Sequence, residues 1–300
     1  METINNAVRL LAKRPSILVL TILISAILCV AENLLMTLFY SVTMFKAGSP
    51  FDAYVNILQF IIDTVMVPST AVKVIMALVV VVLAAALIFG LLLSGYFNIL
   101  INAVQGKTKK PGSEFLAGVH KYFLRMLTVN LWTISLLIMF FIYVAIALVP
   151  ASIFIDNALS GELNIIAGVL MLVVTIIVLF FSYAFFRQYI SFWYPSAFIN
   201  NKNHFKIAKK ISDNNFWPLL SKLIVFDIIL VVFDVIYVIA NFSLANAQVV
   251  SGATSNILLI VNIIFKTIFI AVTVCFVFSA FHMLNEKSKL SAGNTLKNIK

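Results

Sequence analysis

Six long apolar runs constrain the fold of this chain more than any other feature of its sequence. Each is long enough to cross about 30 Å of hydrocarbon, which takes about 20 helical residues. The runs are uniformly apolar, whereas the strands of a membrane barrel are about ten residues long and alternate in polarity. We therefore expect an all-α, polytopic membrane helical bundle that forms a single domain over residues 1–300. The expected transmembrane helices are 16–40, 74–101, 126–155, 163–187, 219–247 and 255–284.

The composition indicates a lipid environment as well. Hydrophobic residues make up 63% of the chain and charged residues 11%, and the mean hydropathy is +1.10. Soluble domains are about 45–50% apolar and about 25% charged, so this composition excludes most of them. The formal charge of +10 would indicate nucleic acid or an acidic partner in a soluble protein. Here Lys and Arg residues that flank the helices account for this charge, and we expect no nucleic-acid partner.

The positions of the basic residues predict the orientation in the membrane. Of the 21 Lys and Arg residues, all except Lys46, Lys73 and Lys266 fall on one side of the expected spans. The positive-inside rule assigns that side to the cytoplasm. Because the bias repeats at every crossing, both chain ends are expected in the cytoplasm. The pattern is typical of a cell-membrane protein such as one of the bacterial inner membrane.

The outer connections differ in length. The first contains Asp52, Asn56, Gln59 and Asp63 at spacings of four, three and four, with apolar residues between them. This pattern predicts an amphipathic helix at 51–67, which lies on the outer interface or caps the bundle. The other two connections, 156–162 and 248–254, are short, and each should join a tight helical hairpin.

The two predicted cytoplasmic loops resemble each other at an offset of 93 residues. Each runs as an extended helix end, a basic polar turn, and a short amphipathic helix that leads into the next span. One interpretation is a chain of repeated units, each an interfacial helix followed by a transmembrane hairpin. The other is that bundles are generally built in this way. The matching residues are Tyr96, Ile99, Leu100, Lys109 and Phe123 in the first loop and Tyr189, Phe192, Trp193, Lys202 and Phe216 in the second.

These loops also carry a family resemblance. The segments Tyr96–Lys110 and Tyr189–Lys210, with Phe192-Trp193-Tyr194-Pro195 and Phe216-Trp217-Pro218, resemble an uncharacterised bacterial six-helix integral membrane family. That family is similar to the membrane domain of some glycerophosphodiester phosphodiesterases. The resemblance implies a fold and no catalytic residue. The chain has no soluble segment of the roughly 250 residues that a catalytic barrel would need.

Four ionisable residues fall within the expected spans: Glu32, Asp227, Asp234 and Lys266. Placing such a residue at the centre of a membrane helix costs about 2.5–3.5 kcal/mol, so each is a functional hypothesis. The fifth and sixth helices should form a tight hairpin, which makes an ion pair between Asp234 and Lys266 geometrically plausible. Three acids against one base imply that at least one carboxyl group is protonated, hydrated or matched by a bound cation.

A heptad spacing places the acids of the fifth helix on one face. Asp227, Asp234, Asn241 and Gln248 are each seven residues apart. Polar residues of the sixth helix can face them. In one interpretation these side chains are packing contacts with an ion pair that fixes the register. In the other they line a cavity for a cation, a proton or an amphiphile headgroup. We call the candidate residues the polar seam; they are Asp227, Asp234, Asn241, Asn262, Lys266 and Glu32.

Outside the spans, a cluster of lysines in the second cytoplasmic loop predicts contact with anionic lipid at about 1 kcal/mol per residue. A protein partner is the alternative interpretation. The cluster consists of Lys202, Lys206, Lys209 and Lys210. The chain has no nucleotide-binding loop, nucleophile elbow or zinc-protease motif, and its histidines are not spaced for a metal site. We therefore expect no catalytic residue, cofactor or metal.

Two functions follow from these features. The first is transport or export of a small molecule or amphiphile through the polar seam, by a bundle that acts as an oligomer. The alternative is a non-catalytic membrane scaffold or accessory subunit in envelope assembly or regulation. A water-accessible cavity at Asp227 and Asp234 would favour transport. A tightly packed interface there would favour the scaffold.

Overall fold

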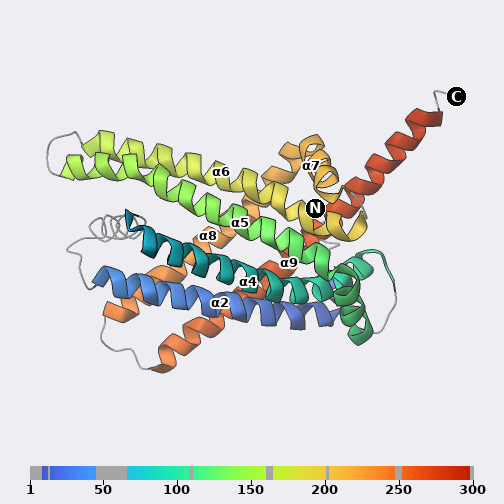
Figure 1. The fold of residues 1–300 in the computed structure, drawn as a ribbon, viewed down its shortest axis with the longest axis horizontal. Helices are drawn as coiled ribbons and strands as arrows, with labels where there is room; N and C mark the ends of the chain where they lie inside the picture. The colour runs from blue at the N-terminus through green and yellow to red at the C-terminus, as the bar shows by residue number, and fades with distance from the viewer. Residues whose placement is uncertain are drawn as a thin grey trace. The chain divides into compact units, whose positions relative to one another are not determined.

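The computed structural model is all-α over the residues that it describes, which are 9–12, 14–44, 66–107, 111–159, 165–200, 203–246 and 252–297. This confirms the predicted fold class. Figure 1 shows the order of the helices along the chain. They are α2 (Pro15–Met44), α4 (Pro68–Val104), α5 (Pro111–Leu159), α6 (Ile165–Ile199), α7 (His204–Asn214), α8 (Phe216–Asn246) and α9 (Gly252–Lys297).

Within the described residues, 6 helices are long and apolar enough to cross a membrane, which agrees with the predicted number of spans. Helices of this kind satisfy their backbone hydrogen bonds internally and can therefore lie in lipid. The chain is a multipass membrane protein. Its candidate spans are Pro15–Leu34, Pro68–Val104, Glu114–Ile155, Ile165–Ile199, Phe216–Asn241 and Asn256–Lys289.

Several helices extend beyond their predicted ends. The fourth expected span was bounded at Arg187, but α6 continues through Pro195 to Ile199. Hydropathy could not find this end, because the added residues are aromatic and polar side chains that pack against protein. The predicted turn at 156–162 is also helical up to Leu159. The predicted amphipathic helix at 51–67 lies outside the described residues except for its last two.

The chain forms two compact units. The first comprises Met1–Val30, Gly90–Val129 and Ala184–Lys300, and the second comprises Ala31–Phe89 and Asn130–Tyr183. Four helices, α2, α4, α5 and α6, pass from one unit into the other, whereas α7, α8 and α9 belong to the first unit alone. The first unit holds most of the buried polar side chains, so the candidate sites are sought there.

Aromatic residues form much of the core of the first unit. The ring of Phe97 on α4 lies 5.4 Å from that of Tyr194 on α6 and 4.8 Å from that of Phe278 on α9, between centroids. Tyr122 on α5 lies 4.3 Å from Phe198. These contacts join four helices, and aromatic pairs at such separations add to the packing energy beyond the area that they bury.

Glycines allow α4 and α5 to approach closely in the first unit. A Cβ atom on Gly118 would lie 2.5 Å from Cβ of Asn98, and one on Gly95 would lie 2.3 Å from the ring of Phe115. No larger side chain fits at either position without a shift. Small residues at helix contacts are the usual means of close packing in membranes, where lipid is as apolar as the side chains it would replace.

The two helices that follow the loops begin 93 residues apart, at Pro111 for α5 and His204 for α7. This spacing is the one that the sequence resemblance between the loops predicted. The helices then differ, because α5 runs unbroken into the membrane whereas the chain turns at Asn215 between α7 and α8. Pro218 favours the turn, because it has no backbone N–H to bond the carbonyl of Asn214, four residues earlier. The corresponding position in α5 is Arg125, which has a normal backbone amide.

The short helix α7 is amphipathic. It buries Ala208, Ile211 and Ser212 against α8 and α9. It begins after Asn203, whose positive φ of 56° is a conformation that asparagine tolerates better than most residues. Its lysines Lys206, Lys209 and Lys210 are exposed on the opposite face, as the amphipathic pattern predicted.

The second unit contains the other halves of α2, α4, α5 and α6. Its α5 and α6 segments meet at Phe140 and Tyr183, whose ring centroids are 6.1 Å apart. Much of its surface is apolar and exposed, which is expected of helices that lie in lipid. Examples are Val80, Val81, Phe141 and Ile166, which are each more than 60% exposed.

Candidate functional site

The acidic face of α8 is the site that the sequence predicted, and it packs against α9 through aromatic rings. The rings of Phe233 and Phe265 are stacked with centroids 3.6 Å apart, and Phe226 lies 6.0 Å from Phe269. Asp227 directly follows Phe226 along α8, and Asp234 directly follows Phe233. Each carboxylate therefore lies next to a residue that packs against α9.

Asp234 forms the ion pair with Lys266 that the sequence predicted. The ammonium group of Lys266 on α9 lies 3.3 Å from a carboxylate oxygen of Asp234. The side chain of Lys266 is 13% exposed, and that of Asp234 is 34% exposed. The pair joins the two helices and leaves one side of the carboxylate accessible.

Asp227 has a different partner from the one that the sequence suggested. It pairs with Arg187 of α6, and its side chain is only 1% exposed. The sequence pattern places Arg187 in the basic flank of the membrane and leaves Asp227 without a base. This prediction is wrong, because α6 continues past Arg187 and brings its guanidinium group to the buried carboxylate. Each acid on α8 thus has a base from a neighbouring helix.

The other predicted polar residues have separate positions along the chain. Asn262 on α9 is fully buried, and the amide of Asn241 donates to the carbonyl of Tyr237 on its own helix at 2.9 Å. Glu32 belongs to the second unit, and Gln248 lies outside the described residues. Of the predicted residues, the structure therefore brings together Asp234 and Lys266. It also pairs Asp227 with Arg187, which is not one of the polar-seam residues.

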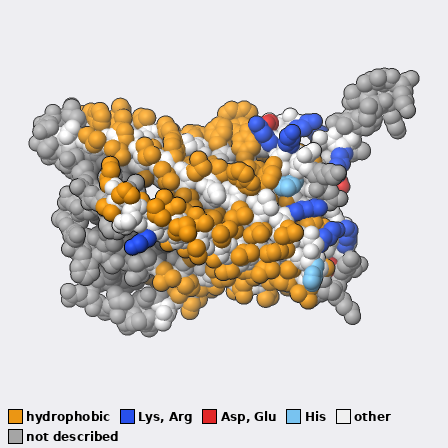
Figure 2. Space-filling model, in the orientation of Figure 1, with side chains coloured by type: hydrophobic (Ala, Val, Ile, Leu, Met, Phe, Trp, Pro, Cys, Tyr) orange, Lys and Arg blue, Asp and Glu red, His pale blue; other side chains and the backbone are white. Residues whose placement is uncertain are grey.

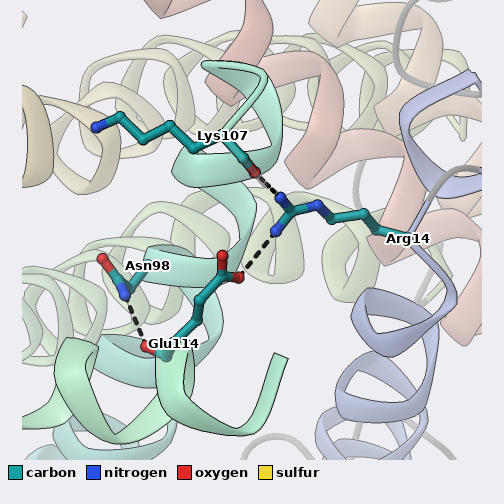
Figure 3. Close-up of polar contacts among 4 residues, drawn as sticks. All are labelled: Arg14, Asn98, Lys107 and Glu114. Carbon is teal, nitrogen blue, oxygen red and sulfur yellow. Dashed lines mark hydrogen bonds and ion pairs between the residues drawn. The ribbon is translucent and has the colours of Figure 1, made fainter. Parts of the chain in front are cut away.

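A second polar cluster, which the sequence did not reveal, lies where the first three spans begin or end (Figure 3). Arg14 extends from the start of α2 and places one guanidinium nitrogen 2.8 Å from Oε2 of Glu114 on α5. A second nitrogen donates to the carbonyl of Lys107, which follows α4. Asn98 on α4 donates to the backbone carbonyl of Glu114 at 2.7 Å. The cluster ties three chain segments together.

Glu114 suits this position for two reasons. Its side chain is fully buried, so the carboxylate needs a positive partner, which Arg14 supplies. It also stands in the first turn of α5, where the helix dipole favours negative charge. Pro111 followed three residues later by an acid is a sequence signal for such a helix start, and it could have located Glu114 but not its partner.

Gln188 on α6 connects three helices at the second loop by hydrogen bonds. Its amide donates to Oγ of Ser212 on α7 at 3.3 Å and to the carbonyl of Phe216 on α8 at 3.2 Å. Both Gln188 and Ser212 are fully buried. The turn between α7 and α8 is thereby fixed to α6.

His204 begins α7, outside the spans, and its environment within the fold favours the neutral ring. Burial lowers the pKa of His204, and the nearby guanidinium of Arg125 lowers this pKa further. The carbonyl of His204 accepts a hydrogen bond from Ser196 at 2.7 Å, and its ring lies 4.3 Å from that of Phe205. The residue is built into the junction between α6 and α7.

A groove opens between the start of α8 and the end of α9. It encloses about 120 Å³, and its walls are mainly apolar, with Lys222 and Asn215 as its polar lining residues. Neither Asp227 nor Asp234 lines it. Among the described residues, no three His, Cys, Asp or Glu side chains gather closely enough to hold a metal ion.

The basic end of the first unit is visible in Figure 2, where Lys and Arg side chains gather over the region of α7. The adjoining surface is mostly hydrophobic. Exposed lysines here include Lys206, Lys209 and Lys210, whereas Lys202 lies outside the described residues. We call this surface, with Lys222, the basic end.

The fold and these charged contacts define a multipass helical membrane protein. No family model matches the chain, and neither a curated protein nor a solved structure matches it. The resemblance to the bacterial six-helix membrane family therefore stays a prediction.

Proposed function

We propose that this chain is a non-catalytic protein of the cell membrane, with both termini in the cytoplasm, that acts as a scaffold or accessory subunit. The observation that carries this proposal is the pairing of both acids on α8. Asp227 is buried against Arg187, and Asp234 pairs with Lys266. Charges that are matched between helices fix register and hold a bundle together.

The proposed working surface is the basic end. The amphipathic helix α7 is anchored to α8 and α9 by its apolar face, and its three described lysines are exposed. Basic residues next to a membrane are attracted to the anionic lipid of the cytoplasmic leaflet. In this proposal the basic end holds anionic lipid and orients the protein for its partners.

Transport is a second candidate, and one observation favours it. The side chain of Asp234 remains 34% exposed, so its ion pair with Lys266 is open on one side. A cation or proton that reached Asp234 would compete with Lys266. The tightly buried Asp227 would then serve only as a packing residue.

Purified protein in liposomes tests the two candidates. A pH gradient and a K⁺ gradient are imposed, and proton and K⁺ flux is followed with entrapped dyes for the wild type and for Asp234→Asn. The scaffold proposal expects no flux above that of empty liposomes for either protein. A wild-type flux that Asp234→Asn abolishes would overturn it in favour of transport.

The lipid contact is tested separately. We expect the triple variant Lys206→Gln/Lys209→Gln/Lys210→Gln to retain less anionic phospholipid after mild detergent extraction than the wild type. A matched variant is Lys73→Gln, which removes one exposed charge from the second unit and should change nothing. Equal retention by the triple variant would remove the basic end from the proposal.

A further inference from the structure

The groove between α8 and α9 has the chemistry of a phospholipid site. Leu219 on α8 and Phe276, Ala280 and Leu284 on α9 form its apolar walls. Phe276 and Ala280 are almost completely buried, so these walls belong to the packed core rather than to mobile side chains. A surface of this kind in a membrane protein is covered by lipid chains or by protein.

The polar lining of the groove carries positive charge. The exposed side chain of Lys222 lines the groove beside Asn215. The amide of Asn215 already donates one of its two hydrogens to the carbonyl of Ile211 at 3.0 Å. Lys222 is the charged residue of the lining, so recognition of an anion falls mainly to Lys222. None of the lining residues is acidic. An occupant with an apolar chain and a negative headgroup complements both parts.

The position of the groove along α8 also fits a lipid at the membrane surface. Trp217 precedes the lining residue Pro218 and is 72% exposed. Exposed tryptophan is typical of the interface between hydrocarbon and headgroups. The lysines of α7, which packs against α8 and α9, add positive charge at the same end of the unit.

We propose that this groove binds one anionic phospholipid, with an acyl chain against the exposed Met283, over the floor formed by Leu219, Phe276 and Ala280, and with the headgroup phosphate at Lys222. The site deepens the proposed function, because it assigns a specific residue and pocket to the lipid that the basic end holds. Lys222 supplies the charge, and the apolar walls favour a ligand with an acyl chain over a soluble anion such as free phosphate.

Quenching of Trp217 fluorescence tests the site in the complete chain. The protein has three tryptophans, so Trp132→Phe/Trp193→Phe leaves Trp217 as the single reporter. This variant is reconstituted into vesicles that contain phosphatidylcholine and phosphatidylglycerol, with one or the other lipid brominated on its acyl chains. We expect brominated phosphatidylglycerol to occupy the site with about fivefold preference, which is what one basic residue contributes near an anionic surface.

Two single substitutions decide the role of Lys222. Lys222→Gln should abolish the preference, because it removes the charge from an exposed position without disturbing the core. The matched control is Lys289→Gln, which removes an exposed charge from α9 outside the groove and should retain the preference. Equal quenching by both lipids, or a preference that survives Lys222→Gln, would overturn the proposal.

A third result of the quenching experiment would also overturn the lipid site. Absence of quenching by either brominated lipid would show that protein covers the groove. The liposome flux assay is independent of this result, since it concerns Asp234 and not Lys222. A failed lipid site therefore leaves the scaffold proposal standing, and ion flux leaves the lipid site standing.

Discussion

Lys266 on α9 lies 3.3 Å from Asp234 on α8, and Arg187 on α6 pairs with Asp227 of the same helix. Asp227 and Asp234 are seven residues apart on one helix, yet their partners come from two different helices. The two pairs thus connect α6, α8 and α9 through a single helix face. This arrangement leads to the first two predictions.

Removing Lys266 alone should destabilise the protein more than removing the whole pair. Lys266→Ala leaves the Asp234 carboxylate without its base, whereas Asp234→Ala/Lys266→Ala removes both charges. We expect the double variant to be more stable than Lys266→Ala by about 0.6–1.7 kcal/mol. These values are the average and the maximum energy measured for polar contacts between membrane helices. Thermal unfolding in detergent measures the difference. Equal stability of the single and double variants would show that the pair is not coupled.

The pair between Arg187 and Asp227 should matter more to stability than the pair at Asp234. Asp227 is 1% exposed and Asp234 is 34% exposed, so a stranded charge at Asp227 has less access to water. Breaking a buried pair costs about 3–5 kcal/mol in soluble proteins. Arg187→Gln should therefore lower the free energy of unfolding more than Lys266→Gln. The double variant Asp227→Asn/Arg187→Gln should recover part of the stability that Arg187→Gln loses. The reverse order of the two single variants would contradict this.

The close contact between α4 and α5 should be sensitive to one methyl group. A Cβ atom on Gly118 would lie 2.5 Å from Asn98 and 2.7 Å from the carbonyl of Ser94. We expect Gly118→Ala to destabilise the protein by about 1–3 kcal/mol, as overpacked cores do. Gly90→Ala is the matched control, since its Cβ would meet Phe123 at an ordinary 3.4 Å. Unfolding in denaturant compares the two, and similar stability would refute the close contact.

The junction at His204 should make stability depend on pH. The fold lowers the pKa of this histidine, so below its ordinary pKa of about 6.5 the unfolded chain binds more protons than the folded one. The free energy of unfolding should therefore be level above pH 6.5 and fall as the pH falls below it. His204→Gln should reduce this dependence between pH 7.5 and 5.5. An unchanged slope in the variant would exclude His204 as its source.

Much of the fold could be predicted because its signals are local. A transmembrane span is a run of apolar residues, and a heptad stripe lies within one helix, so the six spans and the face of Asp227 and Asp234 were evident. The Asp234–Lys266 pair followed because α8 and α9 are consecutive and joined by a short connection. The predicted likeness between the loops was also visible in the sequence, and the starts of α5 and α7 keep its spacing.

The contacts that could not be predicted join residues far apart in the sequence. Arg14 and Glu114 are 100 residues apart, and both fall in segments that hydropathy assigns to the edge of the membrane. Arg187 was misplaced for a related reason. The positive-inside rule counts a basic residue next to an apolar run as part of the flank, and it cannot detect that the helix continues and turns the guanidinium group inward. Helix ends and long-range partners therefore depend on packing that the sequence does not display.

The unbroken course of α5 has a mechanical consequence. Its 49 residues amount to about 74 Å of helix at 1.5 Å per residue, more than twice the roughly 30 Å of hydrocarbon that a span must cross. Arg14 holds the first turn of this helix through Glu114. A force on that turn is therefore transmitted directly along the part of α5 that belongs to the first unit, up to Val129. The second loop differs, because the chain turns at Asn215 and α7 meets α8 through packed side chains and the hydrogen bonds of Gln188, not through a continuous helix.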